Sequence, residues 1–543
     1  MSVLENALGV KVVKMYNSLK SGRKNWDSHW DEVAKFVIPR KDDVYGQATQ
    51  GENRTNRLFD TEGIRANDEL SAALHGMLTN PSLVWFGLNT GDGKVDQHVD
   101  AMKWYSSSVA KMIQVLNNSN FQTEIMETYQ DLGSIGTNAL RMEDDNDDTI
   151  RFHSTPIYGV VIDVNSKGDV DTVGRCYEYS ARQILEEFKI TDENIKSMLE
   201  DEVKNTSSKK HEIIQMVMPR SAADMKGGVG STAFPFMSVH VLRKGRLTLK
   251  EGGFEEFPYA VPRWSKTNKE LYGRSPAMKV LADIKMVNSM KKVVIQGAQL
   301  AIAPPLQMTD NGLLHPLNVK PYGTNYRRPN SDKIEPLFTG SNVNIGIEVL
   351  ELVKNSIREA FLLNKLNLVE SDRMTATEVI QRRDEQLRTL GPILGRLHRE
   401  LLKPIIDRLF SIMDRKNMFD ELPDVLKQKL GDSGGKLDIK YVSSIAQAQL
   451  TVQSENMVRA LSASASILEF QPQVMDFIDG DALLKKNMAI YGVDGIILRS
   501  DTEVEQIRAD RAEQQQKLAE QQQQLANAET VNKVGQVAGQ TGQ

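Results

Sequence analysis

Apolar side chains recur at helical spacing through the first 150 residues of the chain. Trp26, Trp30 and Val33 fall on one face of a segment that Pro39 ends. A later segment stops before Asn80-Pro81, because the residue before a proline disfavours helical backbone. The pattern predicts four helices, over residues 26–38, 61–78, 96–117 and 120–135.

In the middle of the chain the period changes from helical to extended. Apolar, β-branched runs at 158–164 and 170–179 flank the turn sequence Asn165-Ser166-Lys167-Gly168, which predicts a hairpin. Ser180 is placed to cap a short helix that starts at Arg182. Further strands are predicted at 213–218, 238–243 and 247–250.

Two long helices follow, separated by a proline-rich insert. Ser275-Pro276 puts a capping serine before a proline at the first helical position, which is a start signal. The helix predicted from there to residue 303 has about 27 residues and spans about 40 Å at 1.5 Å per residue. The insert, 304–342, is predicted to be a small β or loop module, and the second helix covers 344–363.

The C-terminal part is again helical. Residues 364–373 break the period, and a third long helix is predicted over 375–417, with Gly391-Pro392 as a kink. Residues 418–500 are predicted to be helical, with a short β or loop piece around 436–442. The Gln-rich end is expected to form an exposed helix and to be disordered beyond Thr530. The whole pattern predicts a mainly helical α+β protein.

Composition narrows the class of protein. The chain has 543 residues, which at about 150 per domain predicts three or four domains. With 67 basic and 72 acidic residues its net charge is −5, which disfavours a protein whose main task is tight DNA binding. The single cysteine, Cys176, excludes an intramolecular disulfide and suits a reducing compartment. We expect no signal peptide and no membrane span, because no run of about 18 apolar residues occurs.

No spacing in the sequence indicates a catalytic or metal site. In the glycine-rich loop Lys226–Thr232 a serine, Ser231, stands where a phosphate loop needs lysine, so a nucleotide-dependent enzyme is the weaker alternative. The acidic run 143–148 lacks the glycine and final glutamate of a calcium loop, which favours a hairpin turn. No histidine pair has the i, i+4 spacing of a helical zinc site. We therefore expect no cofactor, no metal and no catalysis.

Several short stretches, weak singly, occur in a distinctive order over about residues 1–500. They are Trp30-x-x-Val33-Ala34-Lys35-Phe36-x-x-Pro39, Leu58-Phe59-Asp60-Thr61, Trp85-Phe86-x-Leu88, Asp163 to Val170 with Val173-x-Arg175, Phe257 to Trp264, Tyr272-Gly273-Arg274-Ser275-Pro276 and Met374-Thr375-Ala376-Thr377-Glu378-Val379. In this order the chain resembles the portal, or head-to-tail connector, of short-tailed phages of the T7 type.

The resemblance implies the portal fold, assembled as a ring of twelve subunits around a DNA channel. Residues 1–270, β-rich at 150–265, would form a wing together with the kinked helix 374–417. The other implied parts are stem helices at 275–303 and 343–363, a clip at 304–342, a tunnel loop at 364–373, a crown at 418–505 and a Gln-rich tail at 506–543.

The function that the resemblance implies is structural. The ring would occupy one capsid vertex of the virion, after assembly in the bacterial host cytoplasm, and serve as the channel for DNA packaging and ejection. The implied partners are double-stranded DNA, the terminase and then the tail adaptor protein, capsid and scaffolding proteins, and internal virion proteins. Twelve copies would carry about −60 charges, which suits DNA that must slide. A tail or internal virion scaffold that forms no ring is the second alternative.

The resemblance also implies sites. Lys365 and Arg373 would face DNA from the tunnel loop, whereas basic residues between helices are otherwise usually solvated. The clip interface would include Tyr322, Arg327 and Arg328. A long helix with an apolar face has nothing to bury it against in a monomer, so that face is expected to pack between subunits. The residues expected there are Leu281, Ile284, Val353 and Ile357.

Overall fold

The chain divides into two units, each built from segments that are far apart in the sequence. One unit combines residues 1–81 with 115–412, and the other combines 82–114 with 413–543. The computed structural model describes residues 2–41, 51–96, 98–145, 147–188, 190, 193–205, 209–221, 230–303, 305–307, 318, 326, 329, 335–336, 343–366, 391–432, 440–443, 458–460, 462, 479–490, 499 and 501–540.

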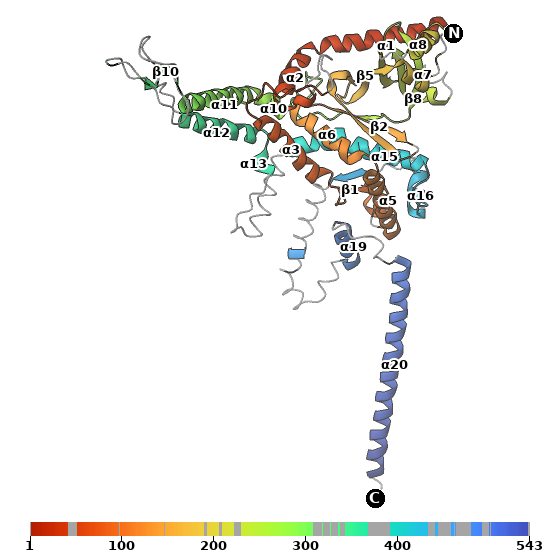
Figure 1. The fold of residues 1–543 in the computed structure, drawn as a ribbon. Helices are drawn as coiled ribbons and strands as arrows, with labels where there is room; N and C mark the ends of the chain where they lie inside the picture. Colours follow the sequence, from red (N-terminus) through yellow and green to blue (C-terminus); the bar gives the residue numbers. More distant parts are fainter. Residues whose placement is uncertain are drawn as a thin grey trace. The chain divides into compact units, whose positions relative to one another are not determined.

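The first unit contains the helices predicted near residues 26–38, 61–78, 120–135 and 182, and two more, over 2–22 and 193–204, that the sequence pattern did not single out (Figure 1). Their bounds are α1 (Ser2–Gly22), α2 (Lys24–Val37), α3 (Glu62–Leu78), α6 (Phe121–Ser134), α7 (Ala181–Glu187), α8 (Glu193–Lys204), α10 (Pro276–Lys279), α11 (Leu281–Ile302), α12 (Val343–Ala360) and α13 (Leu363–Leu366). Ser275 caps α10 by accepting a hydrogen bond from the Met278 N–H at 3.0 Å. A break at Val280 then divides what the sequence predicted as one helix.

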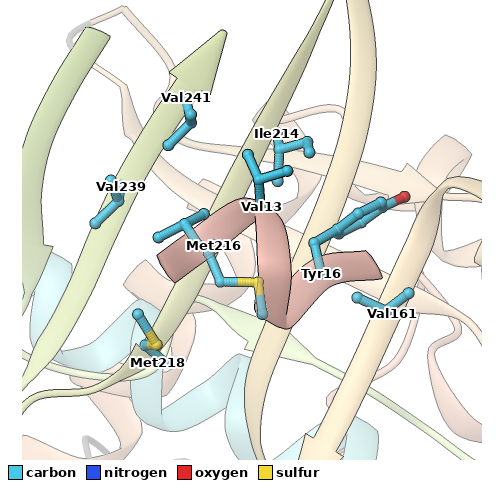
Figure 2. Packing of buried hydrophobic residues seen from close by; sticks show 9 residues of the cluster. Val13, Tyr16, Val161, Ile214, Met216, Met218, Val239 and Val241 are labelled. Atoms are coloured by element: carbon cyan, nitrogen blue, oxygen red, sulfur yellow. The ribbon is translucent and has the colours of Figure 1, made fainter. Parts of the chain in front are cut away.

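The predicted strands form a five-stranded antiparallel sheet. Its order is β4 (Val160–Val164), β5 (Val170–Ser180), β6 (Lys210–Pro219), β7 (Phe236–Leu242) and β8 (Leu247–Phe254). Helix α1 packs on one face, where Val13 and Tyr16 meet Ile214 and Met216 (Figure 2). Helices α7 and α8 cover Ile213 and its neighbours on the opposite face. Successive residues of a strand point to opposite faces, which explains why both sides of β6 are apolar.

A second, three-stranded sheet holds the acidic hairpin. Strand β2 (Ala139–Asp145) lies between β3 (Thr149–Thr155) and β9 (Tyr259–Ala260), all antiparallel. Of the acidic run, residues 143–145 end β2 and residues 147–148 form a turn before β3, as predicted for a hairpin. Residues 391–397 and α15 (Lys403–Arg415) are helical and are joined by a π-helical turn, His398–Leu402. The predicted kink at Gly391-Pro392 lies at the edge of the described residues and stays a prediction.

The second unit pairs two strands from distant parts of the sequence. Strand β1 (Phe86–Asn89) pairs antiparallel with β12 (Lys440–Ser443), so the described part of the β or loop piece predicted around 436–442 is a strand. Its helices are α4 (Gly93–Asp96), α5 (Val99–Asn118, shared with the first unit), α16 (Asp424–Asp432), α19 (Gly480–Ile490) and α20 (Asp501–Gln540). The expectation of disorder beyond Thr530 is wrong: α20 continues to Gln540. The Ala- and Gln-rich stretch before Thr530 favours the helix, and once a helix has formed each further residue adds one backbone hydrogen bond, and no proline stops it before Gln540.

One buried ion pair fixes the π-helical turn to the loop that follows β9. Glu400 accepts hydrogen bonds from the backbone N–H and Nε of Arg263 at 3.0 and 3.1 Å, and from Nη2 at 2.7 Å. The Arg263 side chain is 2% exposed, and Nη2 also donates to the Gly168 carbonyl. A charge so deeply buried depends on its partner.

We therefore expect Glu400→Gln to lower the free energy of unfolding by about 3–5 kcal/mol, because Arg263 would be left buried without a counter-charge. The measurement is urea denaturation at fixed protein concentration. The control is Glu212→Gln, which removes an exposed pair with Arg243 and should cost about 0–1 kcal/mol. Equal effects of the two substitutions would contradict the prediction.

Candidate functional site

Helices α11 and α12 form a hairpin that extends from the first unit, here called the helix pair (Figure 1). The chain leaves α11 through β10 (Leu306–Gln307) and returns to α12 through β11 (Glu335–Pro336), and these two strands pair antiparallel. The helices approach closely at Gly346, where a Cβ atom would lie 3.0 Å from the Val294 side chain. A side chain at position 346 would require the Val294 side chain to shift by a few tenths of an ångström.

The base of the helix pair is buried inside its own subunit. Leu281, Ile284 and Ile357 are at most 6% exposed. Ile284 packs on α3 at Gly63, where a Cβ atom would come within 3.3 Å of the isoleucine. The expectation that this apolar face has nothing to bury it within one subunit is therefore wrong at these three positions, and at Ile284 the covering element is α3. Val353 is half-buried.

The rest of the helix pair exposes large apolar side chains. From Asn288 to Ile302, residues that the structure describes throughout, no side chain of α11 is buried. Val293 is 64% exposed, Ile302 84% and, on α12, Leu352 69%. The other exposed large apolar residues of the pair are Met286, Ile295, Leu300, Ile347 and Val349. Exposed apolar groups gathered on one element mark a surface that binds a partner.

Two carboxylates before and at the start of α3 bind the basic residues of the helix pair. Asp60 accepts a hydrogen bond from Lys291 of α11 at 3.0 Å and lies 3.2 Å from the Lys354 ammonium of α12. Glu62 accepts from Arg358 of α12 at 2.7 Å and lies 3.8 Å from Lys354. Both carboxylates are nearly buried, with 4% and 7% of their side chains exposed.

The surroundings of Asp60 keep it ionised. Burial alone would raise the pKa of this carboxyl group. The Glu62 N–H and the ammonium groups of Lys291 and Lys354 outweigh burial, so the pKa lies below its usual value. Asp60 is therefore a fixed negative charge at neutral pH.

Other titratable groups with displaced pKa values belong to packing rather than to a shared site. Burial, and then the nearby Arg175, lowers the pKa of His240 to about 3, and its Nδ1 is hydrogen-bonded to the Tyr177 hydroxyl at 3.0 Å. Burial raises the pKa of the Cys176 thiol, which makes it a poor nucleophile. Within the described ranges, no group of three or more His, Cys, Asp or Glu could hold a metal ion, and no helix there could cross a membrane.

The remaining sequence-predicted site residues are not brought together by the described part of the chain. The backbone of Lys365 belongs to α13, but its side chain lies outside the described residues, as does Arg373. Tyr322, Arg327 and Arg328 lie outside them too, as does most of the glycine-rich loop, residues 226–229. The carboxylates Asp60 and Glu62 were missed by sequence reasoning, although Asp60 stands in one of the stretches that carry the resemblance.

These features define a structural protein that binds partners through extended helices, and comparison with known proteins gives its family. The chain belongs to the bacteriophage head to tail connecting protein family, whose model it matches over residues 11–498. It is therefore a phage portal protein, a non-catalytic virion component of the head–tail junction.

Two curated relatives are similar over nearly their whole length. The portal protein of Salmonella phage epsilon15 is 28% identical over 518 residues, which cover 93% of this chain and 91% of the relative. The probable portal protein of Bordetella phage BPP-1 is 27% identical over 541 residues, covering 97% and 95%. These relatives support the portal family in general and do not single out the T7 type.

Solved structures show a more distant similarity. A chain from the neck of an empty gene transfer agent particle, computed with C6 symmetry, aligns with a TM-score of 0.37 at 10% identity, over 82% of this chain and 99% of that one. A chain from the virion of the native gene transfer agent particle gives 0.33 at 11% identity, over 73% and 89%. Similarity at this level carries no argument about this protein.

The contrast between buried and exposed side chains of the helix pair predicts opposite results for two substitutions. Ile284→Asp should lower the free energy of unfolding by about 2–5 kcal/mol, because it removes buried apolar volume and buries a charge. Leu352→Asp should change it by about 0.5 kcal/mol or less, because the side chain is exposed in the subunit. Urea denaturation of the monomeric fraction tests both, and a large loss with Leu352→Asp would contradict this assignment.

Proposed function

We propose that copies of this chain assemble into a closed ring, of twelve subunits, around a channel for double-stranded DNA. The observation that carries the proposal is the exposed apolar surface on the outer part of the helix pair in a protein of the head–tail junction. Side-by-side packing of neighbouring helix pairs in a ring would bury these side chains. Each large apolar side chain that becomes fully buried contributes about 1.5–3 kcal/mol.

The charge of the chain supports a channel through which DNA slides. With a net charge of −5 per subunit, a twelvefold ring carries about −60, and a surface of that sign does not grip phosphates. Lys291, Lys354 and Arg358 are engaged with carboxylates of their own subunit. These three basic side chains are therefore held by their own subunit rather than left to bind DNA.

In this proposal the helix pair is the stem, and the other parts follow from the resemblance. The 304–342 segment is the clip, which docks the terminase and afterwards the tail adaptor through Tyr322, Arg327 and Arg328. The antiparallel pairing of β10 with β11 at its two ends supports a compact β module there. Residues 364–373 form the tunnel loop and 418–505 the crown, which faces the capsid interior, its scaffolding proteins and the internal virion proteins.

Native mass spectrometry of the purified protein tests the ring. Twelve copies of 60.9 kDa predict a species of about 730 kDa with a central hole in negative-stain images. The double variant Val293→Asp, Leu352→Asp should shift the population to small species, because it places charges on the proposed subunit contact. A wild-type protein that stays a folded monomer or dimer would remove the channel and leave a scaffold that forms no ring.

Charge reversal tests the tunnel loop separately. Lys365→Glu with Arg373→Glu should reduce DNA packaging or retention severalfold, because two cations near the duplex become anions, while ring assembly stays intact. The matched control is Lys11→Glu with Lys14→Glu, an equal charge change at two exposed positions of α1. Packaging assays and native mass spectrometry are the measurements, and normal packaging by the tunnel-loop variant would refute the assigned role.

A further inference from the structure

The polar contacts between the helix pair and the rest of its unit gather at the base. On α11 they involve Lys285, Asn288 and Lys291, and on α12 Lys354 and Arg358. Beyond this base the two helices extend away from the sheets and helices of the unit (Figure 1). A small rotation at the base therefore becomes a large displacement at the far end.

One side chain of α11 holds the backbone that leads into α3. The Asn288 Oδ1 atom accepts hydrogen bonds from the N–H groups of Phe59 and Asp60, at 2.6 and 3.2 Å. Its Nδ2 group donates to the Arg57 carbonyl at 3.4 Å. This segment and α11 therefore move together.

Asp60 connects both helices to that segment at once. Its Oδ2 atom faces the ammonium groups of Lys291 on α11 and Lys354 on α12, while its Oδ1 accepts the Glu62 N–H at 2.8 Å. Glu62 adds the contact to Arg358. The carboxylates are shielded from water, so salt screens these pairs much less than surface pairs.

Neutralising these carboxylates would reverse the local balance of forces. Lys291 and Lys354 both approach the same oxygen of Asp60, so without its charge they repel each other across the helix pair. The Lys354 side chain is only 14% exposed, so water could replace little of its lost interaction with Asp60. The helices would then separate or tilt relative to α3.

In a closed ring the inclination of such an arm decides how many subunits fit. Twelvefold and thirteenfold closure differ by only about 2° of rotation per subunit, so a hinge of a few degrees is enough to admit both. A ring built through the proposed stem contacts therefore needs a rigid stem base if it is to close with one number of subunits.

We propose that Asp60 and Glu62 are positioning residues that hold the helix pair at one inclination and thereby restrict the ring to a narrow range of subunit numbers. This inference rests on the proposed ring.

The test compares ring masses of the wild type with those of Asp60→Asn combined with Glu62→Gln. Asparagine at position 60 can still accept a hydrogen bond from the backbone N–H of residue 62, so the variant loses charge and keeps nearly the same shape. We expect its native mass spectrum to contain ring species one or more subunits, each 60.9 kDa, away from the wild-type ring. The control is Glu178→Gln with Glu212→Gln, which neutralises two exposed carboxylates of the five-stranded sheet and should leave the distribution unchanged.

Two further variants separate charge from folding. Asp60→Glu keeps the charge and should restore the narrow distribution, and a broad one would assign the effect to packing and overturn the electrostatic role. Lys291→Gln removes only the ion pair between α11 and Asp60. The Lys291 side chain is 38% exposed, so this variant tests the inference even if the double variant does not fold. It should also broaden the distribution.

The outcomes of the two proposals are distinguishable. A wild type without rings refutes the proposed function itself. A folded double variant, or Lys291→Gln, whose ring masses match those of the wild type leaves the ring in place and overturns the role of Asp60 and Glu62.

Discussion

The position of the α11–α12 helix pair depends on how its base packs against the rest of the first unit. Leu281, Ile284 and Ile357 are buried at the base of the pair, and Gly63 of α3 leaves room for Ile284. Buried side chains of this size contribute about 1.5–3 kcal/mol each, which is enough to anchor two helices. The anchor covers only the base, so the rest of the pair extends with apolar side chains facing outward. The subunit therefore buries the apolar side chains at the base of the helix pair and leaves those of its outer part exposed.

Charge follows the same division. The carboxylates Asp60 and Glu62 pair with cations of the helix pair at its base, and both carboxylates are shielded from water. Burying such charges is costly unless they are paired, so each group stabilises the position of the others rather than adding much to overall stability. The pairs also engage three cations, Lys291, Lys354 and Arg358, with carboxylates of their own subunit. The same contacts therefore fix the geometry of the base and occupy these cations.

Local signals predicted the elements well. The Ser275 cap and the hairpin around Asn165 could both be predicted from the sequence, because each depends on neighbouring residues. What the sequence could not supply was the partner of each face. Ile284 lies on an apolar stripe, but periodicity does not say whether α3 or a second subunit covers it. Asp60 and Lys354 are 294 positions apart, so no spacing rule could join them.

Exposure along α11 shows why periodicity alone does not locate a subunit contact on this helix. A stripe at helical spacing suggests one face with one partner along its whole length. In this helix the environment changes along the axis instead: Leu281 and Val287 are buried, whereas Val293 and Ile302 are exposed. The same apolar pattern therefore serves two purposes. Near the start of α11 it packs the helix into its own subunit, and toward the end of α11 it leaves an exposed apolar surface. Only the fold shows where along the helix the change occurs.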